Sequence, residues 1–426
     1  MVDLRSLKTR NMIALPLDIE DVMIQRMQQN QKGDYIITLA STLKGTTCQH
    51  CGRQLTKFYG HGRWITLRHL SILGGRTYLH LRPKQYECRH CEGQITTQDL
   101  SWYQARSPHT HAYDKHLMKQ LIGSTVAEVS RKEDVGYDAV QGAIQRRLQA
   151  TVNWEEFDDL TVIGIDEVAL TKGRRNFVAV ITTQQADGQV AVLAVLPDRK
   201  KTSVRQFLET IPPRLRRTMA TVCIDMWTGY ATAVQDFTAA HPDVALQIVV
   251  DRYHMAKNYR ECVDDLRKHE RRRLKQELSE AEYDELVKGT MWITRKNNAD
   301  LDAEARDRLN RLFAVAPQLK LAYTFREELT AIFEMQLDRK AAQQRLQAWA
   351  AKVRRSPLTC FDSFLTTLDN WGNEILNYFV NRLNSGFVEG LNNKLKSIKR
   401  RCYGITRVIT LFQRLYLDTQ GHHYFA

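Results

Sequence analysis

The feature that most constrains the fold of this chain is a series of short apolar segments between residues 161 and 251. The first three, at 161–166, 176–183 and 189–196, are strand-sized and are separated by the short turns TKGRR and ADG. Turns of this length are typical of hairpins. We therefore expect three consecutive antiparallel strands.

After the third strand, helical and extended patterns alternate. A helix at Ser203–Ile211 precedes the strand ATVCID, and a helix at Thr228–Ala239 precedes the strand ALQIVVD. Such crossovers pair strands in parallel. This order is the ribonuclease H plan, in which the first and fourth strands are central neighbours. Asp166 and Asp225 would then lie side by side at the ends of adjacent strands.

Two neighbouring carboxylates at a sheet edge favour phosphodiester chemistry. Cleavage or transfer requires an activated oxygen nucleophile and charge neutralisation, which two Mg²⁺ or Mn²⁺ ions on hard oxygen ligands supply. The alternative is that Asp166 and Asp225 only end strands near turns, where Asp is common. Glu167 should face the opposite side by strand alternation, whereas Asp251 ends the fifth strand at the same edge and can ligate or orient.

Four of the eight cysteines form two CxxC pairs, Cys48/Cys51 and Cys88/Cys91. Two such pairs predict one structural Zn²⁺ held by four thiolates, which leaves no open position for catalysis. The stretches YGHGRWITLRHL and RTYLHLRPKQYEC between them predict a β-hairpin insert with a turn at Gly74–Gly75. Buried thiols or a redox pair are the alternative. Nearby histidines, at positions 50, 61 and 90, are left out of the ligand set.

A helix-turn-helix is predicted after the cysteines, over residues 105–152. Apolar spacing from about residue 113 fits three short helices, with Ser124 or Thr125 as cap of the middle one. Because the usual glycine is absent from the inter-helix turn, an ordinary packing bundle stays open as an alternative. The side chains expected to face bases or phosphates in the major groove are Gln141, Gln145, Arg146 and Arg147.

Residues 255–380 predict long helices without an interrupting strand. Mixed charges along these helices favour a solvated face over a DNA contact. The segment after Glu389 differs, because basic residues follow it with few acids among them. We expect five of them to hold phosphates: Lys394, Lys396, Lys399, Arg400 and Arg401.

Composition is consistent with a polyanionic partner. Lys and Arg outnumber Asp and Glu by 62 to 48, which gives a net charge of +14 and favours double-stranded DNA through phosphate neutralisation. Charge alone is weak evidence, since many basic proteins bind no nucleic acid specifically. No apolar run reaches the length of a signal peptide or a membrane span, so we expect a cytoplasmic protein with no membrane contact, associated with the nucleoid when DNA-bound.

Four segments, GIDEVALTKGRRNFVAVITT, CIDMWTGYATAV, VVDRYHMAKNY and NSGFVEGLNNKLKSIKRRCYGIT, together resemble the ISL3 family of DDE transposases from bacterial insertion sequences. The resemblance implies a multidomain α+β protein with zinc on Cys48, Cys51, Cys88 and Cys91. It implies catalysis and magnesium binding by Asp166, Asp225 and Glu389. Glu374 is a weaker alternative to Glu389 as the third ligand. The expected domains are an N-terminal arm and zinc ribbon (1–104), the helix-turn-helix (105–152), a ribonuclease H-like core (153–254), a helical insertion (255–380) and the core's C-terminal helix (381–426).

The same resemblance implies binding of terminal inverted repeats, strand cleavage by an activated water, and attack of the freed 3′-hydroxyl on target DNA. Two ends must be joined together, which implies a homodimer or higher oligomer on DNA. Two alternatives use the same sequence features. One is a ribonuclease H-type nuclease or resolvase that does not transfer strands, and the other is a silent DNA-binding regulator derived from a transposase.

Overall fold

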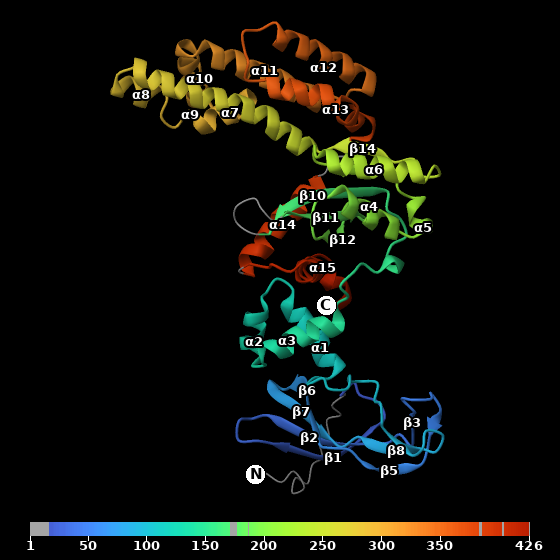
Figure 1. Cartoon of the computed structure of the whole chain (residues 1–426). Coiled ribbons are helices and arrows are strands. Elements are labelled where there is room, and N and C mark those ends of the chain that lie inside the picture. The colour runs from blue at the N-terminus through green and yellow to red at the C-terminus, as the bar shows by residue number, and fades with distance from the viewer. Residues whose placement is uncertain (1–16, 171–176, 186, 383–385, 403, 426) are drawn as a thin grey trace. The chain divides into compact units, whose positions relative to one another are not determined.

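The computed structural model describes residues 17–170, 177–185, 187–382, 386–402 and 404–425. It divides into two compact units, Met1–Ala150 with Gln413–Ala426 and Thr151–Phe412. The N-terminal segment therefore forms most of the first unit, the middle of the chain forms the second, and the C-terminal segment belongs to the first unit again. The colours from blue to red in Figure 1 follow this order. Within the described ranges, no helix is both long and apolar enough to cross a membrane.

A four-stranded sheet opens the first unit. Alternate residues of its two central strands are buried, which places Ile37, Leu39, Leu79 and Leu81 on one face against Trp102. The last two strands form the predicted hairpin, with Leu73 and Gly74 at positive φ in its two-residue turn. In sheet order, the strands are β1 (Val22–Gln29), β2 (Tyr35–Ser41), β7 (Gly75–Leu81) and β6 (Ile65–Ile72).

Two small sheets carry the CxxC pairs. The first pair lies between β3 and β4. In the second pair, Cys88 ends β8 and Cys91 lies in the turn that leads to β9. The hairpin β6–β7 is inserted between the pairs, as expected. It forms one sheet with β1 and β2, two strands that were not expected within the N-terminal arm and zinc ribbon (1–104). The strands are β3 (Thr46–Thr47), β4 (Gln54–Leu55), β5 (Phe58–His61), β8 (Lys84–Cys88) and β9 (Gln94–Thr97).

Three short helices complete the N-terminal part, namely α1 (His111–Leu121), α2 (Val126–Glu133) and α3 (Tyr137–Arg147). Thr125 caps α2 in a reciprocal capping box with Glu128. Asp134 ends α2 in the left-handed conformation at φ 49°, which is the conformation that a glycine usually adopts in such a turn. Leu417 from the last helix, α15 (Val408–Phe425), packs into the core of these helices.

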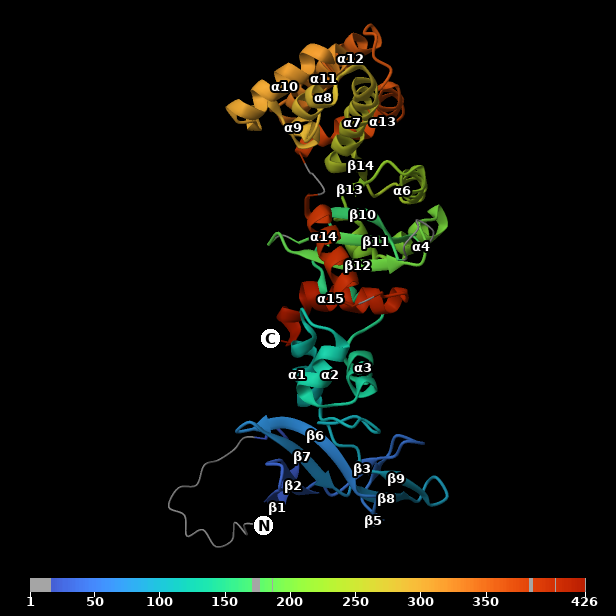
Figure 2. The same cartoon turned by 90° about the vertical axis from the view of Figure 1, so that its left-hand side faces the viewer.

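A five-stranded mixed sheet forms the centre of the second unit, in the order β12-β11-β10-β13-β14. The first three strands are antiparallel, and β13 and β14 run parallel to β10, as the sequence predicted. Helices α4 (Lys201–Thr210) and α6 (Thr228–Ala240) cover one face (Figure 2), where Ile163 and Val222 are buried. The strands are β10 (Val162–Ala169), β11 (Phe177–Gln184), β12 (Val190–Leu196), β13 (Thr221–Ile224) and β14 (Gln247–Val250).

The other face of this sheet packs against a helical region that follows β14. Val162 and Cys223 of the sheet share one core with Phe333 and Phe364 of the helices. No strand occurs between residues 255 and 380, all of which are described. The helices of the second unit are α4 (Lys201–Thr210), α5 (Pro213–Arg216), α6 (Thr228–Ala240), α7 (Arg252–Glu277), α8 (Glu280–Leu286), α9 (Thr290–Arg295), α10 (Ala303–Val315), α11 (Pro317–Glu334), α12 (Arg339–Arg354), α13 (Asp362–Asn381) and α14 (Gly386–Arg401), with short 3₁₀ turns η2 (Trp154–Glu156) and η3 (Asn298–Asp300).

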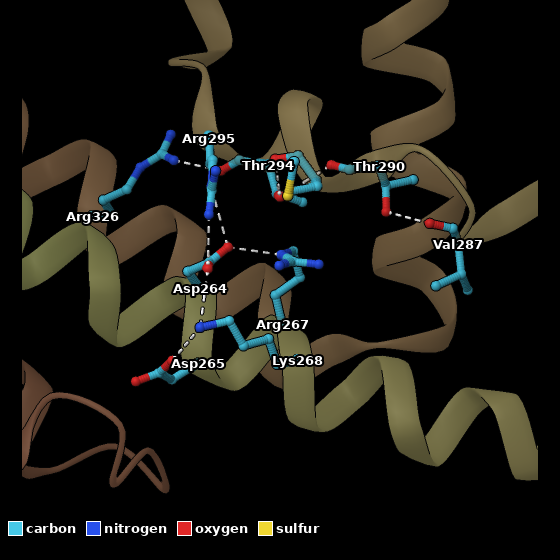
Figure 3. A network of polar contacts seen from close by, with 10 residues as sticks. Asp264, Asp265, Arg267, Lys268, Val287, Thr290, Thr294, Arg295 and Arg326 are labelled. Atoms are coloured by element: carbon cyan, nitrogen blue, oxygen red, sulfur yellow. Dashed lines mark hydrogen bonds and ion pairs between the residues drawn. The ribbon is translucent and has the colours of Figure 1, made fainter. Parts of the chain in front are cut away.

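A partly buried ionic network joins α7 to α9 within this helical region (Figure 3). The Asp264 carboxylate accepts hydrogen bonds from Arg267 at 2.9 Å and from Arg295 at 3.0 Å. These two guanidinium groups lower the pKa of Asp264 to about 2, although burial acts in the opposite direction. Because the carboxylate accepts from two helices at once, it fixes their relative position.

Candidate active site and metal centre

Three acidic residues follow the parallel strands at one edge of the central sheet. Ile165 of β10 is the register partner of Ile224 of β13, which in turn pairs with Val250 of β14. The next residue on each strand is an aspartate, and these are Asp166, Asp225 and Asp251. Asp166 and Asp251 are only 5% and 6% exposed to solvent. Two of the three aspartates are therefore buried at the same level of the sheet.

Strand alternation separates Asp166 from its neighbour Glu167. Ile163 and Ile165 lie in the core beneath α4 and α6, so Asp166 lies on the opposite face. Glu167 faces α4, where its carboxylate pairs with the Arg199 guanidinium at 2.7 Å. The structure therefore gives Glu167 a cationic partner on the face that does not carry Asp166.

Asp225 has a strongly raised pKa. Burial, followed by the negative charges of Asp166 and Glu167, raises its pKa to about 7, and His254 only partly offsets these effects. Its Oδ1 atom is buried and has no hydrogen-bond partner among the described residues. A buried carboxylate oxygen without a donor is suited to a cation, since a hard divalent ion prefers such ligands.

Asp251 and His254 border this pair of carboxylates. Asp251 caps α7 by accepting a hydrogen bond from the backbone N–H of Tyr253 at 2.8 Å. One turn further, the His254 Nε2 atom lies 4.0 Å from Asp166 and 3.9 Å from Asp251. Sequence reasoning missed His254. The three-residue spacing in DRYH, which brings both side chains to one helix face, would have been the signal.

The third expected carboxylate, Glu389, has its backbone in α14, and its side chain lies outside the described part of the structure. Helix α14 lies beside β10 (Figures 1 and 2), and Lys399 donates a hydrogen bond to the carbonyl of Ala169 at the end of that strand. Burial lowers the pKa of Lys399. The alternative ligand Glu374 lines a cavity between α12 and α13 instead, together with Arg354.

The other expected basic residues of α14 differ in exposure. Lys394, Lys396 and Arg400 are exposed, whereas Arg401 is half-buried. Three exposed cations within seven residues remain accessible to phosphates from this helix.

The four expected DNA-contacting side chains of α3 have different surroundings. Gln145 is exposed, and Gln141 donates a hydrogen bond to the Tyr137 hydroxyl. Arg146 makes a two-pronged ion pair with the buried Asp114, with distances of 2.7 and 2.8 Å. The half-buried Arg147 lies 4.0 Å from the same carboxylate. Both arginines are therefore engaged by Asp114, and Gln145 is the most accessible of the four.

The four CxxC cysteines form one cluster, with all ligand atoms within 4.8 Å of one another. The Cys51 and Cys88 sulfurs are 3.7 Å apart, close to the edge of a tetrahedron with four sulfurs at about 2.3 Å from its centre. Among the described side chains, this is the one group of three or more potential ligands gathered closely enough for a metal ion. The cluster fits a structural Zn²⁺.

The thiols of this cluster influence one another. Backbone N–H groups of Cys51 and His50 lower the pKa of Cys48 to about 6, whereas the adjacent Cys51 thiol and burial raise that of Cys91 to about 12. Full ionisation of four crowded thiols requires a cation, and zinc supplies that charge. Gly52 and Gly93 follow the pairs at positive φ, where the chain turns tightly around the sulfurs.

Comparisons with known proteins connect both sites to one family. A transposase family model of the ISL3 type matches residues 163–415, and a zinc-finger model of the transposases of IS204, IS1001, IS1096 and IS1165 matches residues 44–91. The transposase of element IS1001 from Bordetella parapertussis is 29% identical over 86% of this chain and 87% of its own length. The transposase of IS1557 from Mycobacterium tuberculosis is 22% identical over 95% of this chain and 93% of its own.

Proposed function

Because the chain belongs to the ISL3 family of DDE transposases, we propose that it binds the terminal inverted repeats of an insertion sequence and catalyses metal-dependent strand cleavage and strand transfer. The observation that supports this most directly is the pairing of Asp166 and Asp225 at the ends of adjacent parallel strands. The order and direction of the five strands agree with a ribonuclease H-like core.

Two Mg²⁺ or Mn²⁺ ions would be held by Asp166, Asp225 and Glu389. When bound, they supply charge neutralisation and an activated oxygen at the phosphodiester. The protein's own contribution is positional. Asp225 offers an unpartnered buried oxygen, and its high pKa reflects a site that favours added positive charge. Asp251 holds the start of α7, which keeps His254 beside Asp166.

The zinc ribbon and the helices α1–α3 would recognise the terminal repeats, with α3 as the second helix of a helix-turn-helix. Basic residues on α14 would hold phosphates near the carboxylates, and two ends would be brought together by a homodimer or larger assembly. The DNA-binding set comprises Gln141, Gln145, Arg146, Arg147, Lys394, Lys396, Lys399, Arg400 and Arg401. For Arg146, binding would require exchange of its pair with Asp114, so Gln145 is the first of the α3 residues to test.

The proposal is tested with duplexes that carry the element's own ends, in Mg²⁺ or Mn²⁺, by following cleavage and joining. The intact protein is compared with Asp166→Ala, Asp225→Ala and Glu389→Ala. We expect each variant to lose both reactions and to keep end binding. An intact protein that binds ends without cutting or joining them would leave a binding or regulatory role in place of catalysis.

A further inference from the structure

An aromatic and cationic surface lies on the α4 side of the catalytic edge and takes no part in the metal site. The Arg199 guanidinium is centred 4.1 Å from the Trp227 ring and 4.8 Å from the Phe177 ring. These groups, with Lys200 and Lys201, line a surface cavity of about 430 Å³. We call the surface formed by Arg199, Lys200, Lys201 and Trp227 the Trp227 shelf.

The Trp227 shelf is held rigidly. The Trp227 indole N–H donates a hydrogen bond to the Arg199 carbonyl at 3.3 Å, and the Arg199 guanidinium is fixed by Glu167. A Cβ atom at Gly229 would approach Trp227 Nε1 to 2.7 Å, so the ring packs over a glycine at the start of α6. Trp227 nevertheless remains 38% exposed. An aromatic ring that is immobilised yet open to solvent provides a preorganised stacking surface.

The connections of this shelf lead directly to the catalytic edge. Trp227 follows Asp225 by two residues, and Glu167, the partner of Arg199, follows Asp166 by one. A ligand bound on the Trp227 shelf would therefore lie close to a phosphodiester held by the two aspartates. The shelf and the aspartates lie at the same edge of the sheet but on its two opposite sides.

Lys200 places an exposed ammonium group at the cavity that Trp227 also lines. Its side chain is 76% exposed and pairs with the Asp198 carboxylate at 3.3 Å, and a phosphate would replace Asp198 in this weak surface ion pair. Asp198 would keep its hydrogen bonds from the Ser203 hydroxyl at 2.6 Å and from the Lys200 backbone N–H. Lys201 is half-exposed and pairs with Asp236 at 2.6 Å. Base stacking on an exposed aromatic ring contributes about 1–3 kcal/mol in single-stranded complexes.

We propose that the Trp227 shelf binds one unpaired nucleotide next to the scissile phosphate, with its base stacked on Trp227 and its phosphate on Lys200. The proposal rests on the proposed function, because it assumes that a DNA end lies at Asp166 and Asp225. It adds a positioning site that requires local unpairing of that end.

A crosslinking experiment tests the shelf independently of cleavage. Duplexes of the element's own end carry 5-iodouracil at single positions around the terminus and are irradiated with the full-length protein in Ca²⁺. We expect a crosslink that maps to Trp227 at one or two positions and disappears in Trp227→Ala. Trp292, which is 66% exposed beside Arg295, provides the matched control, and Trp292→Ala should leave the crosslink unchanged. Crosslinks that map elsewhere and survive Trp227→Ala would overturn the proposal.

Cleavage assays separate positioning from folding. We expect Trp227→Ala to slow cleavage about tenfold or more, since one lost stacking contact of this strength corresponds to that factor. Trp227→Phe should restore most of the rate. On an end with an abasic site at the crosslinked position, wild type and Trp227→Ala should cut equally. An equal loss on intact and abasic ends would show a purely structural role. A wild-type protein that crosslinks through Trp227 and does not cut DNA would contradict the proposed cleavage and transfer activity. It would not contradict nucleotide binding on the Trp227 shelf.

Discussion

Asp166 and Asp225 directly follow Ile165 and Ile224, which are register partners on neighbouring parallel strands, and the charge of Asp166 contributes to the raised pKa of Asp225. The two carboxylates therefore repel each other in a partly dehydrated position. A folded protein that keeps both groups ionised without a cation is destabilised relative to its unfolded chain.

Burial of Asp225, together with this repulsion, predicts a pH dependence of the metal-free protein. The pKa of Asp225 is about 7 in the folded state against 3.8 ordinarily, so between pH 4 and 7 the folded state binds more protons. The unfolding free energy must then fall as pH rises through that interval, by at most about 4 kcal/mol. We expect Asp225→Asn to reduce this fall, as measured by urea unfolding in EDTA at pH 5 and pH 8.

The same variant should lose its response to metal. Mg²⁺ is expected to raise the melting temperature of the wild type at pH 8 and to have a much smaller effect on Asp225→Asn. Asp243→Asn provides the control, because Asp243 is exposed and its one ion pair among the described residues is a 3.9 Å contact with Arg217. A melting temperature of Asp225→Asn that rises with Mg²⁺ as steeply as that of the wild type would count against Asp225 as a ligand.

Much of the central sheet was predictable because hairpin turns and helix–strand alternation are local signals. TKGRR and ADG indicated antiparallel strands, and the helices before ATVCID and ALQIVVD indicated parallel ones, which the pairing of β10 to β14 confirms. The strand β1 was not predicted, since VMIQRMQQ lacks the alternation of a half-buried strand and is largely exposed. Strand β1 forms through its pairing with β2, and the residue pattern of β1 alone does not show this pairing.

The cysteine cluster predicts zinc-dependent stability of the N-terminal unit. We expect about one Zn²⁺ per chain, and Cys91→Ser should lower the zinc content and destabilise the ribbon, because three sulfurs and a hydroxyl bind the ion more weakly. Metal analysis and thermal unfolding measure both effects. Cys360→Ser provides the control, since Cys360 lies outside the cluster. Equal zinc content in the two variants would contradict the four-sulfur site.

The last helix predicts a dependence of the N-terminal unit on the C-terminus. Arg414, which is 3% exposed, donates to the carbonyls of Leu121 and Ser124 after α1, and Asp418 accepts from the Gly123 N–H at 3.2 Å. Arg414→Met would leave the buried carbonyls without this donor and Asp418 without its 3.8 Å partner. We expect a loss of roughly 2–4 kcal/mol.

Hydrogen exchange of the α1–α3 amides measures that loss, with the exposed Arg407→Met as control. Unchanged protection in Arg414→Met would mean that the C-terminal helix contributes little. Sequence reasoning placed residues 381–426 in a single segment, because no local pattern shows that the chain returns to the first unit at Gln413.

Only some residues of the candidate site could be predicted from the sequence, for a related reason. Asp166 and Asp225 end apolar strands, which is a local signal. His254 and Arg199 acquire their roles from the partners they meet, namely Asp166 at 4.0 Å and the Trp227 ring at 4.1 Å. These partners lie tens of residues away in sequence, and only the register of the sheet brings them together.

The ionic network between α7 and α9 makes the helical region sensitive to acid. Asp264 has a pKa of about 2 in the folded state against 3.8 ordinarily, so its stabilisation is fully present above pH 4 and is lost as pH falls toward 2. We expect Asp264→Asn to lower the unfolding free energy by about 2 kcal/mol at pH 7. The difference from wild type should shrink at pH 3, because the Asp264 carboxyl of the unfolded chain is then mostly protonated while that of the folded chain is still mostly ionised.

Asp265→Asn is the matched control, because Asp265 is exposed and contacts only the exposed Lys268 among the described ion pairs. Urea unfolding of the three proteins at pH 7 and pH 3 distinguishes the outcomes. An Asp264→Asn penalty that is unchanged between these pH values would show that the variant disturbs packing and that ionisation of Asp264 contributes little.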